Sequence, residues 1–116
     1  MKTIHPFVPR NDTLQSVKII LENIVGLELL CRGCKVSVGR ISDKENGFVA
    51  EKQSDKLYVH VCYLLSDETT TQREFGSLLD VRDNYPKIVL YQEGSFRGNY
   101  EGIPAIRIED WLMGNN

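Results

Sequence analysis

The sequence predicts an α/β protein in which one mixed sheet is flanked by helices. A long segment of helical periodicity precedes three short strand-like segments, and a second helical segment separates the third strand from the fourth. A fifth strand and a short helical turn complete the order. Three consecutive strands favour an antiparallel meander, whereas the helix between the third and fourth strands permits a parallel crossover.

The first helix is the most strongly patterned element. Asp12 or Thr13 can cap its start, and Gly33 is placed to end it. Apolar residues between these points recur at spacings of three and four, which predicts a helix with one buried stripe. That stripe consists of Leu14, Val17, Ile20, Leu21, Ile24, Leu27 and Cys31.

Five segments have the pattern of strands. The third is apolar on both faces, which predicts a central position in the sheet. The fifth contains Pro104, which indicates an edge strand, and a second copy of the chain could pair there. The five segments are 35–41, 48–52, 56–65, 87–92 and 103–108.

A second helix is expected after Ser66 and Asp67, which are both capping residues. Residues 93–102 are glycine-rich without the spacing of a phosphate-binding loop, and residues 109–114 form a helical turn. The buried stripe of the second helix is predicted to consist of Phe75, Leu78 and Leu79.

Composition limits the classes of protein to consider. A chain of 116 residues is expected to form one domain, here residues 16–113, with an extended arm at 1–15 and a tail at 114–116. The net charge of −2 with mixed signs gives little support to nucleic-acid binding. No apolar run reaches the roughly 20 residues needed to span a bilayer, so no membrane partner is expected. The N-terminus lacks the apolar centre of a signal peptide, which favours a cytoplasmic location.

Four stretches carry a family resemblance: "LENIVGLELLCRGCKVSVGRI", "GFVAEK", "VHVCYLLSDETTTQREFGSLLDVRDNYPKIVL" and "GIPAIRIEDWLMG". From about Ser16 to Leu112 the chain resembles the C-terminal domain of unknown function found on many bacterial and archaeal AAA+ ATPases. The resemblance implies a prokaryotic protein with a fold similar to PD-(D/E)XK nucleases. The implied core is restriction-endonuclease-like, in the order α-β-β-β-α-β-β-α.

The resemblance also indicates which residues occupy the nuclease positions. Active nucleases of this fold hold Mg²⁺ with an acid on the second strand and an acid-x-Lys on the third, often assisted by a glutamate on the first helix. Here Glu22 matches the helix glutamate, Gly47 the second-strand acid, and His60-Val61-Cys62 the acid-x-Lys. Two of the three carboxylates and the lysine are missing. We therefore expect a degenerate site with no catalytic residue, no metal and no cofactor.

Two alternative functions would give these residues a chemical role. A divergent Mg²⁺-dependent nuclease could use Glu22 with Glu45 or Glu51 as compensating acids, because strand alternation puts position 51 on the same face as 47. A small zinc- or thiol-containing protein is the second alternative, and its candidate ligands are Cys31, Cys34, Cys62 and His60.

The simpler interpretation of these cysteines is structural. Cys31 and Cys62 are then small buried hydrophobes, and His60 is a buried, hydrogen-bonded histidine. A disulfide framework is not expected from three cysteines in the cytoplasm.

The candidate contact loop contains Phe96, Arg97 and Tyr100, since aromatic residues and arginine favour interfaces, although packing within the domain is equally open. There is no Walker A motif for ATP hydrolysis. We expect a non-catalytic interaction module rather than an enzyme. Its partner is expected to be a protein, either an ATPase module or a second copy.

Overall fold

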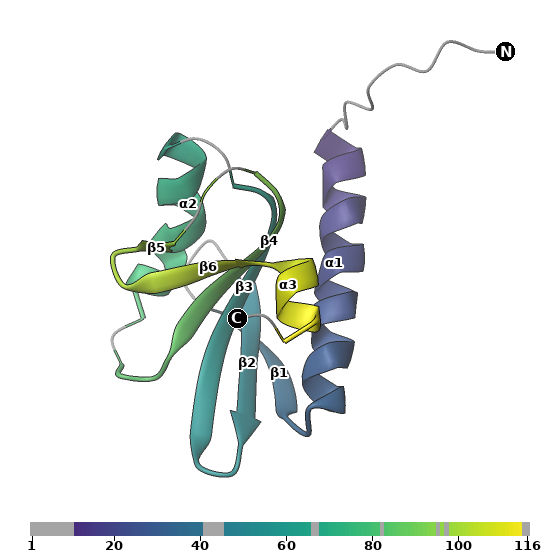
Figure 1. Ribbon diagram of the computed structural model, residues 1–116, viewed down its shortest axis with the longest axis vertical. Coiled ribbons are helices and arrows are strands. Elements are labelled where there is room, and N and C mark those ends of the chain that lie inside the picture. The colour runs from purple at the N-terminus through teal and green to yellow at the C-terminus, as the bar shows by residue number, and fades with distance from the viewer. Residues whose placement is uncertain are drawn as a thin grey trace, which may run out of the picture.

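The computed structural model describes residues 11–40, 46–65, 68–81, 83–94, 96 and 98–114, with three helices and six strands (Figure 1). None of the described helices is both long and apolar enough to cross a membrane. The helices are α1 (Asn11–Cys31), α2 (Glu68–Leu79) and α3 (Ile108–Leu112). The strands are β1 (Lys35–Arg40), β2 (Asn46–Lys52), β3 (Asp55–Leu64), β4 (Lys87–Glu93), β5 (Asn99–Tyr100) and β6 (Ile103–Arg107).

The strands form one mixed sheet in the order β1-β2-β3-β4-β6-β5. The meander β1-β2-β3 is antiparallel, and β4 pairs in parallel with both β3 and β6. The predicted mixed sheet, with its antiparallel meander and its parallel crossover through α2, is therefore confirmed. The central position predicted for the third strand is also confirmed, because β3 lies between β2 and β4.

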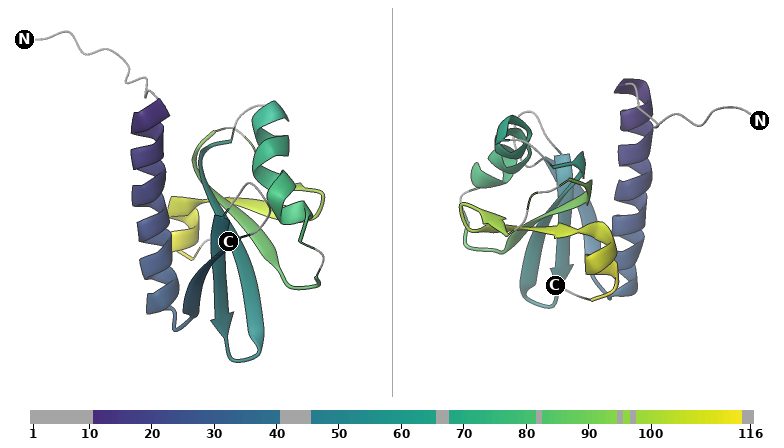
Figure 2. Two further views of the ribbon diagram at one scale, coloured as in Figure 1. Left: turned by 180° about the vertical axis from the view of Figure 1, so that it is seen from behind. Right: turned by 45° about the horizontal axis from the view of Figure 1, so that its top comes forward.

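The helices cover both faces of the sheet, with α1 and α3 on one side and α2 on the other (Figure 2). Alternation along β3 explains the two separate cores. Val59 and Val61 pack with α1 and α3 in one cluster, whereas Cys62 packs with Phe75 and Leu78 of α2 in the other. Burying both faces of β3 and β4 requires the nearly continuous apolar sequence that these strands have.

The single buried stripe predicted for the first helix is wrong. Residues at spacings of four face the sheet, and most of the predicted stripe is exposed on the opposite side of α1. Both sides of the helix are apolar, but the sheet can cover only one of them. Periodicity alone therefore does not predict which side is buried. Leu21, Val25 and Leu29 are buried with Val17 beside them, and Ile20, Ile24, Leu27 and Cys31 are exposed.

The prediction from the sequence is wrong for the start of α1 and right for its end. The helix begins at Asn11, so residues 11–15 are helical and do not belong to the extended arm expected there. Gly33 ends the helix as predicted, with φ at +86°. The Cys34 and Gly33 amides donate to the carbonyls of Leu29 and Leu30 at 3.0 Å each, a Schellman arrangement that favours glycine. Residues 1–10, the tail residues 115–116, and Ser66 and Asp67 lie outside the described part of the chain.

The edge predicted at residues 103–108 is covered by the chain itself. Residues 99–100, expected in a loop, form β5, which pairs with Pro104 and Ile103 of β6. The Ala105 amide donates to the Gly98 carbonyl at 3.0 Å. β6 therefore lies between β4 and β5, so a second copy cannot pair with residues 103–105 in the way the sequence suggested.

Arg32 joins the end of α1 to α3. Its guanidinium carbon lies 4.3 Å from the centre of the Trp111 ring, and Nη2 donates to the Trp111 carbonyl at 2.6 Å. Nε donates to the Glu28 carboxylate at 2.7 Å. Because Trp111 is only 2% exposed, this contact holds a large apolar side chain of α3 against α1.

Candidate functional site

The nuclease-like positions do not meet in one place. Phe48 pairs with Val59, so strand alternation puts Gly47, His60 and Cys62 together on the face covered by α2. Glu22 belongs to α1, which covers the opposite face. Of Gly47, His60 and Cys62, only Gly47 lines a pocket together with Glu22. This pocket has a volume of about 180 Å³ and is lined by Ile19, Glu22, Asn23, Val38, Gly47 and Phe48.

His60 is paired with a residue of α2. The imidazole is 1% exposed, and its Nε2 lies 3.1 Å from Oε2 of Glu74, which is 8% exposed. Burial acts to raise the pKa of Glu74, but the hydrogen bond and charge of His60, with the charges of Lys18 and Arg73, outweigh it and lower that pKa. The carboxylate is therefore ionised at neutral pH, and His60 Nε2 carries the proton and donates to it.

Two polar atoms beside this pair have no hydrogen-bond partner among the described residues. They are His60 Nδ1 and Ser77 Oγ, and both are buried. The His60 side chain is thus fixed by Glu74 through one ring nitrogen only. The predicted buried, hydrogen-bonded histidine is confirmed, and its partner is now identified.

Cys62 has a protonated, inaccessible thiol. It is 3% exposed, and burial, followed by the negative charge of Glu74, raises its pKa far above the ordinary range. A buried, protonated thiol is a poor nucleophile at neutral pH. The small buried hydrophobe expected at this position is confirmed, whereas the same expectation for Cys31 is wrong because Cys31 is exposed.

Of the two compensating acids, the structure describes Glu51. Glu51 is exposed and lies directly across from Lys35 on one neighbouring strand and Lys56 on the other. Opposite charges in these positions favour a cross-strand ion-pair arrangement. Glu45 lies outside the described residues.

The proposed zinc ligands are separated by the sheet. Cys34 packs with the cluster on the α1 side, whereas His60 and Cys62 lie on the α2 side, and Cys31 is exposed at the end of α1. Across the described ranges, no three His, Cys, Asp or Glu side chains form a group that could hold a metal ion.

The aromatic residues of the predicted contact loop pack inward. The rings of Phe96 and Tyr100 lie 5.5 Å and 5.1 Å from the ring of Phe75 on α2, measured between centroids. Both residues are partly buried against the second core cluster. Of the two interpretations of this loop, packing within the domain therefore applies to these two rings. Arg97 lies outside the described residues.

A polar cluster at the start of β4 was not anticipated from the sequence. The Tyr58 hydroxyl donates to Asp83 Oδ2 at 2.6 Å, and Lys87 Nζ donates to Asp83 Oδ1 at 3.1 Å. The hydrogen bond from Tyr58, with further contacts from Lys87, lowers the pKa of Asp83, and the same bond raises the pKa of Tyr58. Lys87 also donates to the carbonyls of Asp83 and Tyr85, so all three of its donors are used within the turn.

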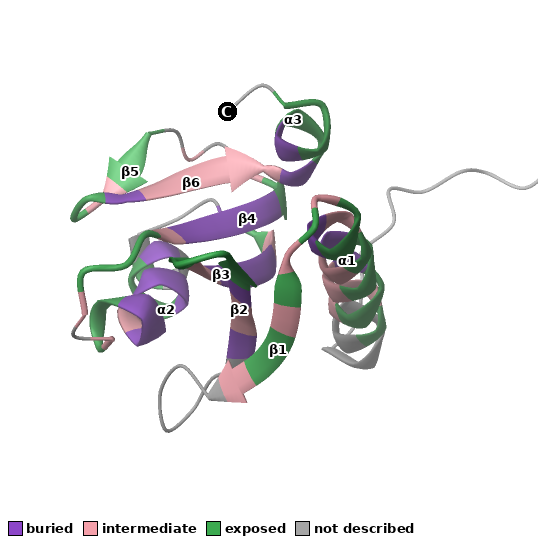
Figure 3. Cartoon of the chain, turned by 90° about the horizontal axis from the view of Figure 1, so that it is seen from below, coloured by how far each residue is buried: buried purple, intermediate pink, exposed green. Residues whose placement is uncertain are grey.

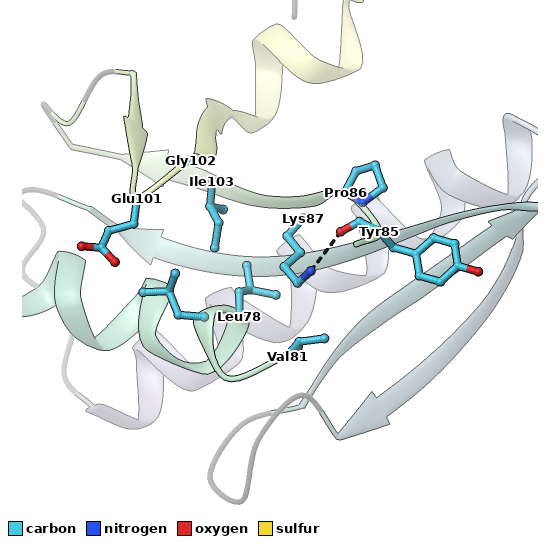
Figure 4. A pocket seen from close by; sticks show the side chains of 9 residues that line it. Leu78, Val81, Tyr85, Pro86, Lys87, Glu101, Gly102 and Ile103 are labelled. Atoms are coloured by element: carbon cyan, nitrogen blue, oxygen red, sulfur yellow. Dashed lines mark hydrogen bonds between the residues drawn. The ribbon is translucent and has the colours of Figure 1, made fainter. Parts of the chain in front are cut away.

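A pocket of about 310 Å³ lies beside this cluster, between the end of α2 and the start of β4 (Figure 4). Leu78, Val81 and Ile103 form its apolar part, and Lys87 and Glu101 are charged residues in its lining. Since the Lys87 ammonium is fully engaged by the turn, Lys87 stabilises the connection from α2 to β4.

The helical spacing could have placed Glu74 on the buried side of α2, although not its pairing with His60. Thr71, Glu74, Phe75 and Leu78 recur at three- and four-residue intervals and are all buried on α2, whereas Leu79 of the predicted stripe is 38% exposed. The Tyr58–Asp83–Lys87 cluster had no comparable signal, because "DNYPK" has the composition of an ordinary turn.

Comparisons with known proteins give one informative relative. No family model matches the chain, and no solved structure matches it. An uncharacterized protein of Haemophilus influenzae is 40% identical over 93 residues, which is 80% of this chain and 22% of the relative. The chain therefore spans about a fifth of the length of that relative.

Proposed function

We propose that this chain is a non-catalytic recognition module with a PD-(D/E)XK-like fold, corresponding to the C-terminal domain of prokaryotic AAA+ ATPases. Its role is to bind a protein partner rather than to cleave nucleic acid. The observation that carries this proposal is the burial of the positions where an active nuclease would hold its metal.

The acid-x-Lys positions are occupied by a histidine and a protonated thiol, which are poor ligands for Mg²⁺. His60 and Cys62 are 1% and 3% exposed, and α2 covers them with Glu74 placed on His60. A metal ion or a phosphodiester could reach these side chains only if α2 moved away from the sheet. Glu22, on the other side of the sheet, is the one acid among the described residues that line the pocket at Gly47.

The topology and the relative support the family part of the proposal. The order α1-β1-β2-β3-α2-β4, with an antiparallel meander followed by a parallel crossover, is the arrangement expected of a nuclease-like core. The relative from Haemophilus influenzae has most of its length outside the matched segment, as expected if the segment is one module of a larger protein.

The proposal is tested by titrating metal-free protein with Mn²⁺ and with Zn²⁺ in a calorimeter and assaying cleavage of DNA and RNA on the same sample. We expect no saturable binding of either metal and no cleavage. The Glu22→Gln variant serves as the control, because it removes the one remaining nuclease-like carboxylate without changing the volume of the side chain.

Two outcomes would contradict the proposal. Saturable Mn²⁺ binding with cleavage that Glu22→Gln abolishes would establish a divergent nuclease. Binding of one Zn²⁺ per chain without cleavage would establish a zinc protein, and Cys31→Ser and Cys34→Ser would then identify the ligands.

A further inference from the structure

Between Ser16 and Cys31, where side-chain burial is described, the outward side of α1 is an exposed surface without charge. The exposed residues between Ser16 and Cys31 are five large apolar side chains together with Ser16, Asn23 and Cys31. At 3.6 residues per turn they fall within a sector of about 140°. The large side chains are Ile19 (56% exposed), Ile20 (57%), Ile24 (39%), Leu27 (63%) and Leu30 (56%). We call the sector formed by these five residues, Asn23 and Cys31 the α1 outer face.

Between Ser16 and Cys31 the charged residues of α1 lie elsewhere. Lys18, Glu22 and Glu28 are half-buried, and at 3.6 residues per turn Lys18 falls among the sheet-facing positions while Glu22 and Glu28 fall at their margins. A surface helix normally carries its charges on the side that faces water. Figure 3 shows the exposed residues of α1 along the side that faces away from the sheet. An exposed apolar face with the charges placed away from water is typical of a surface that another protein covers.

The spacing along this face is that of a helix pair. Ile20, Ile24, Leu27 and Cys31 follow one another at intervals of four, three and four residues, the repeat by which side chains of one helix fit between those of a second. Beyond Ile19 the apolar surface continues to Val38 of β1, which is 71% exposed and lines the same 180 Å³ pocket.

We propose that the α1 outer face is the interface for a second copy of this chain, with α1 packed against α1 about a two-fold axis. This inference names the partner of the recognition module and so rests on the proposed function. A two-fold interface places one surface against itself, and an uncharged face with an even apolar repeat meets its own image without like-charge repulsion.

The available area is sufficient for a weak, reversible dimer. Each of the five large side chains has on the order of 100 Å² or less left to bury, so two copies would together remove on the order of 1,000 Å² from water. That value is at the lower end for specific interfaces. The dimer is therefore expected to dissociate in the micromolar range.

The test is the molar mass in solution, measured by sedimentation across the micromolar range in the presence of a reductant. The reductant prevents Cys31 from forming a disulfide that would imitate association. We expect the mass to rise with concentration from 13.3 kDa towards twice that value. Leu27→Glu, at the centre of the repeat, is expected to remain at the mass of one chain with an unchanged melting temperature.

Met113→Glu is the matched control, because Met113 is 76% exposed at the end of α3, outside the α1 outer face. This variant should associate as the unmodified chain does. A single-chain mass for the unmodified protein at all concentrations would overturn the inference. Association that survives both Leu27→Glu and Ile20→Glu would also overturn it. Neither result depends on metal binding or cleavage, so failure here is distinguishable from failure of the proposed function.

Discussion

Glu74 of α2 and His60 of β3 form a buried pair across the crossover, with 3.1 Å between Oε2 and Nε2. The pair joins the middle of the sheet to the helix that covers it. A buried hydrogen bond to an ionised carboxylate contributes to stability only while both partners are present.

Replacing either member of the pair should destabilise the fold. We expect His60→Leu to cost about 3 kcal/mol of unfolding free energy because it leaves the Glu74 carboxylate buried without its partner. Glu74→Leu should cost about 1–3 kcal/mol, since it leaves a buried imidazole donor without an acceptor. Urea denaturation of the two variants and the double variant gives the coupling energy, which we expect to exceed about 1 kcal/mol.

Arg73→Ala is the control for this cycle. Its Nε lies 3.9 Å from Glu74 Oε1 and its side chain is 69% exposed, so the change should stay within about 0.5 kcal/mol. Strict additivity of the His60 and Glu74 substitutions would show that the two side chains act independently.

Because of the same pair, the stability of the fold should depend on pH. The folded protein lowers the pKa of Glu74 below its value in the unfolded chain, so ionised Glu74 stabilises the fold above the unfolded pKa. This contribution is lost as the pH falls through the folded pKa. The midpoint of urea denaturation should therefore fall more steeply below about pH 4.3 in the unmodified protein than in Glu74→Gln. Parallel curves for the two proteins would contradict the prediction.

Two of the three cysteines, Cys31 and Cys62, should differ in reactivity. Cys31 is exposed, whereas Cys62 is buried with a raised pKa, so iodoacetamide should label Cys31 in the folded protein and Cys62 only after unfolding. Mass spectrometry of the labelled peptides gives the labelling rates of Cys31 and of Cys62. Zn²⁺ should leave the rate at Cys31 unchanged, because the candidate ligands lie on different sides of the sheet. Protection of Cys31 by Zn²⁺ would contradict the described arrangement.

Gly94 should not tolerate a side chain. Its φ is +136°, and a Cβ there would lie 2.6 Å from the carbonyl carbon of Leu65 and closer still to the carbonyl oxygen. Gly94→Ala should therefore cost about 3 kcal/mol or more, from backbone strain together with overpacking. Gly98→Ala isolates the strain, since φ is +93° with no atom within 4 Å of the new Cβ, and should cost about 1–2 kcal/mol. Equal costs in a thermal melt would be inconsistent with the close approach at Leu65.

The elements with a clear repeat could be predicted from the sequence. Strand alternation located β1 and β2, the apolar run of β3 indicated its central position, and Gly33 marked the end of α1. Each of these features depends on neighbours in the sequence, so local pattern was enough. The helix between β3 and β4 permitted the parallel pairing that the structure shows.

The features that depend on distant contacts could not be predicted in the same way. Leu21 and Leu27 are the same residue type on the same helix, but only the position of the sheet decides that the first is buried and the second exposed. β5 exists because residues 99–100 return beside β6, and no apolar pattern marks them. The pairing of His60 with Glu74 required both the face of β3 and the face of α2 to be known.

The contact between Arg32 and Trp111 joins residues 79 positions apart, whereas β2 and β3 are joined by a tight turn. Closing a long loop costs more chain entropy than closing a short one, so the β1-β2-β3 meander should form before α3 docks. Trp111 is the single tryptophan of the chain and becomes buried only at that docking step. Its fluorescence should therefore report the last stage of folding, separately from the circular dichroism of the sheet.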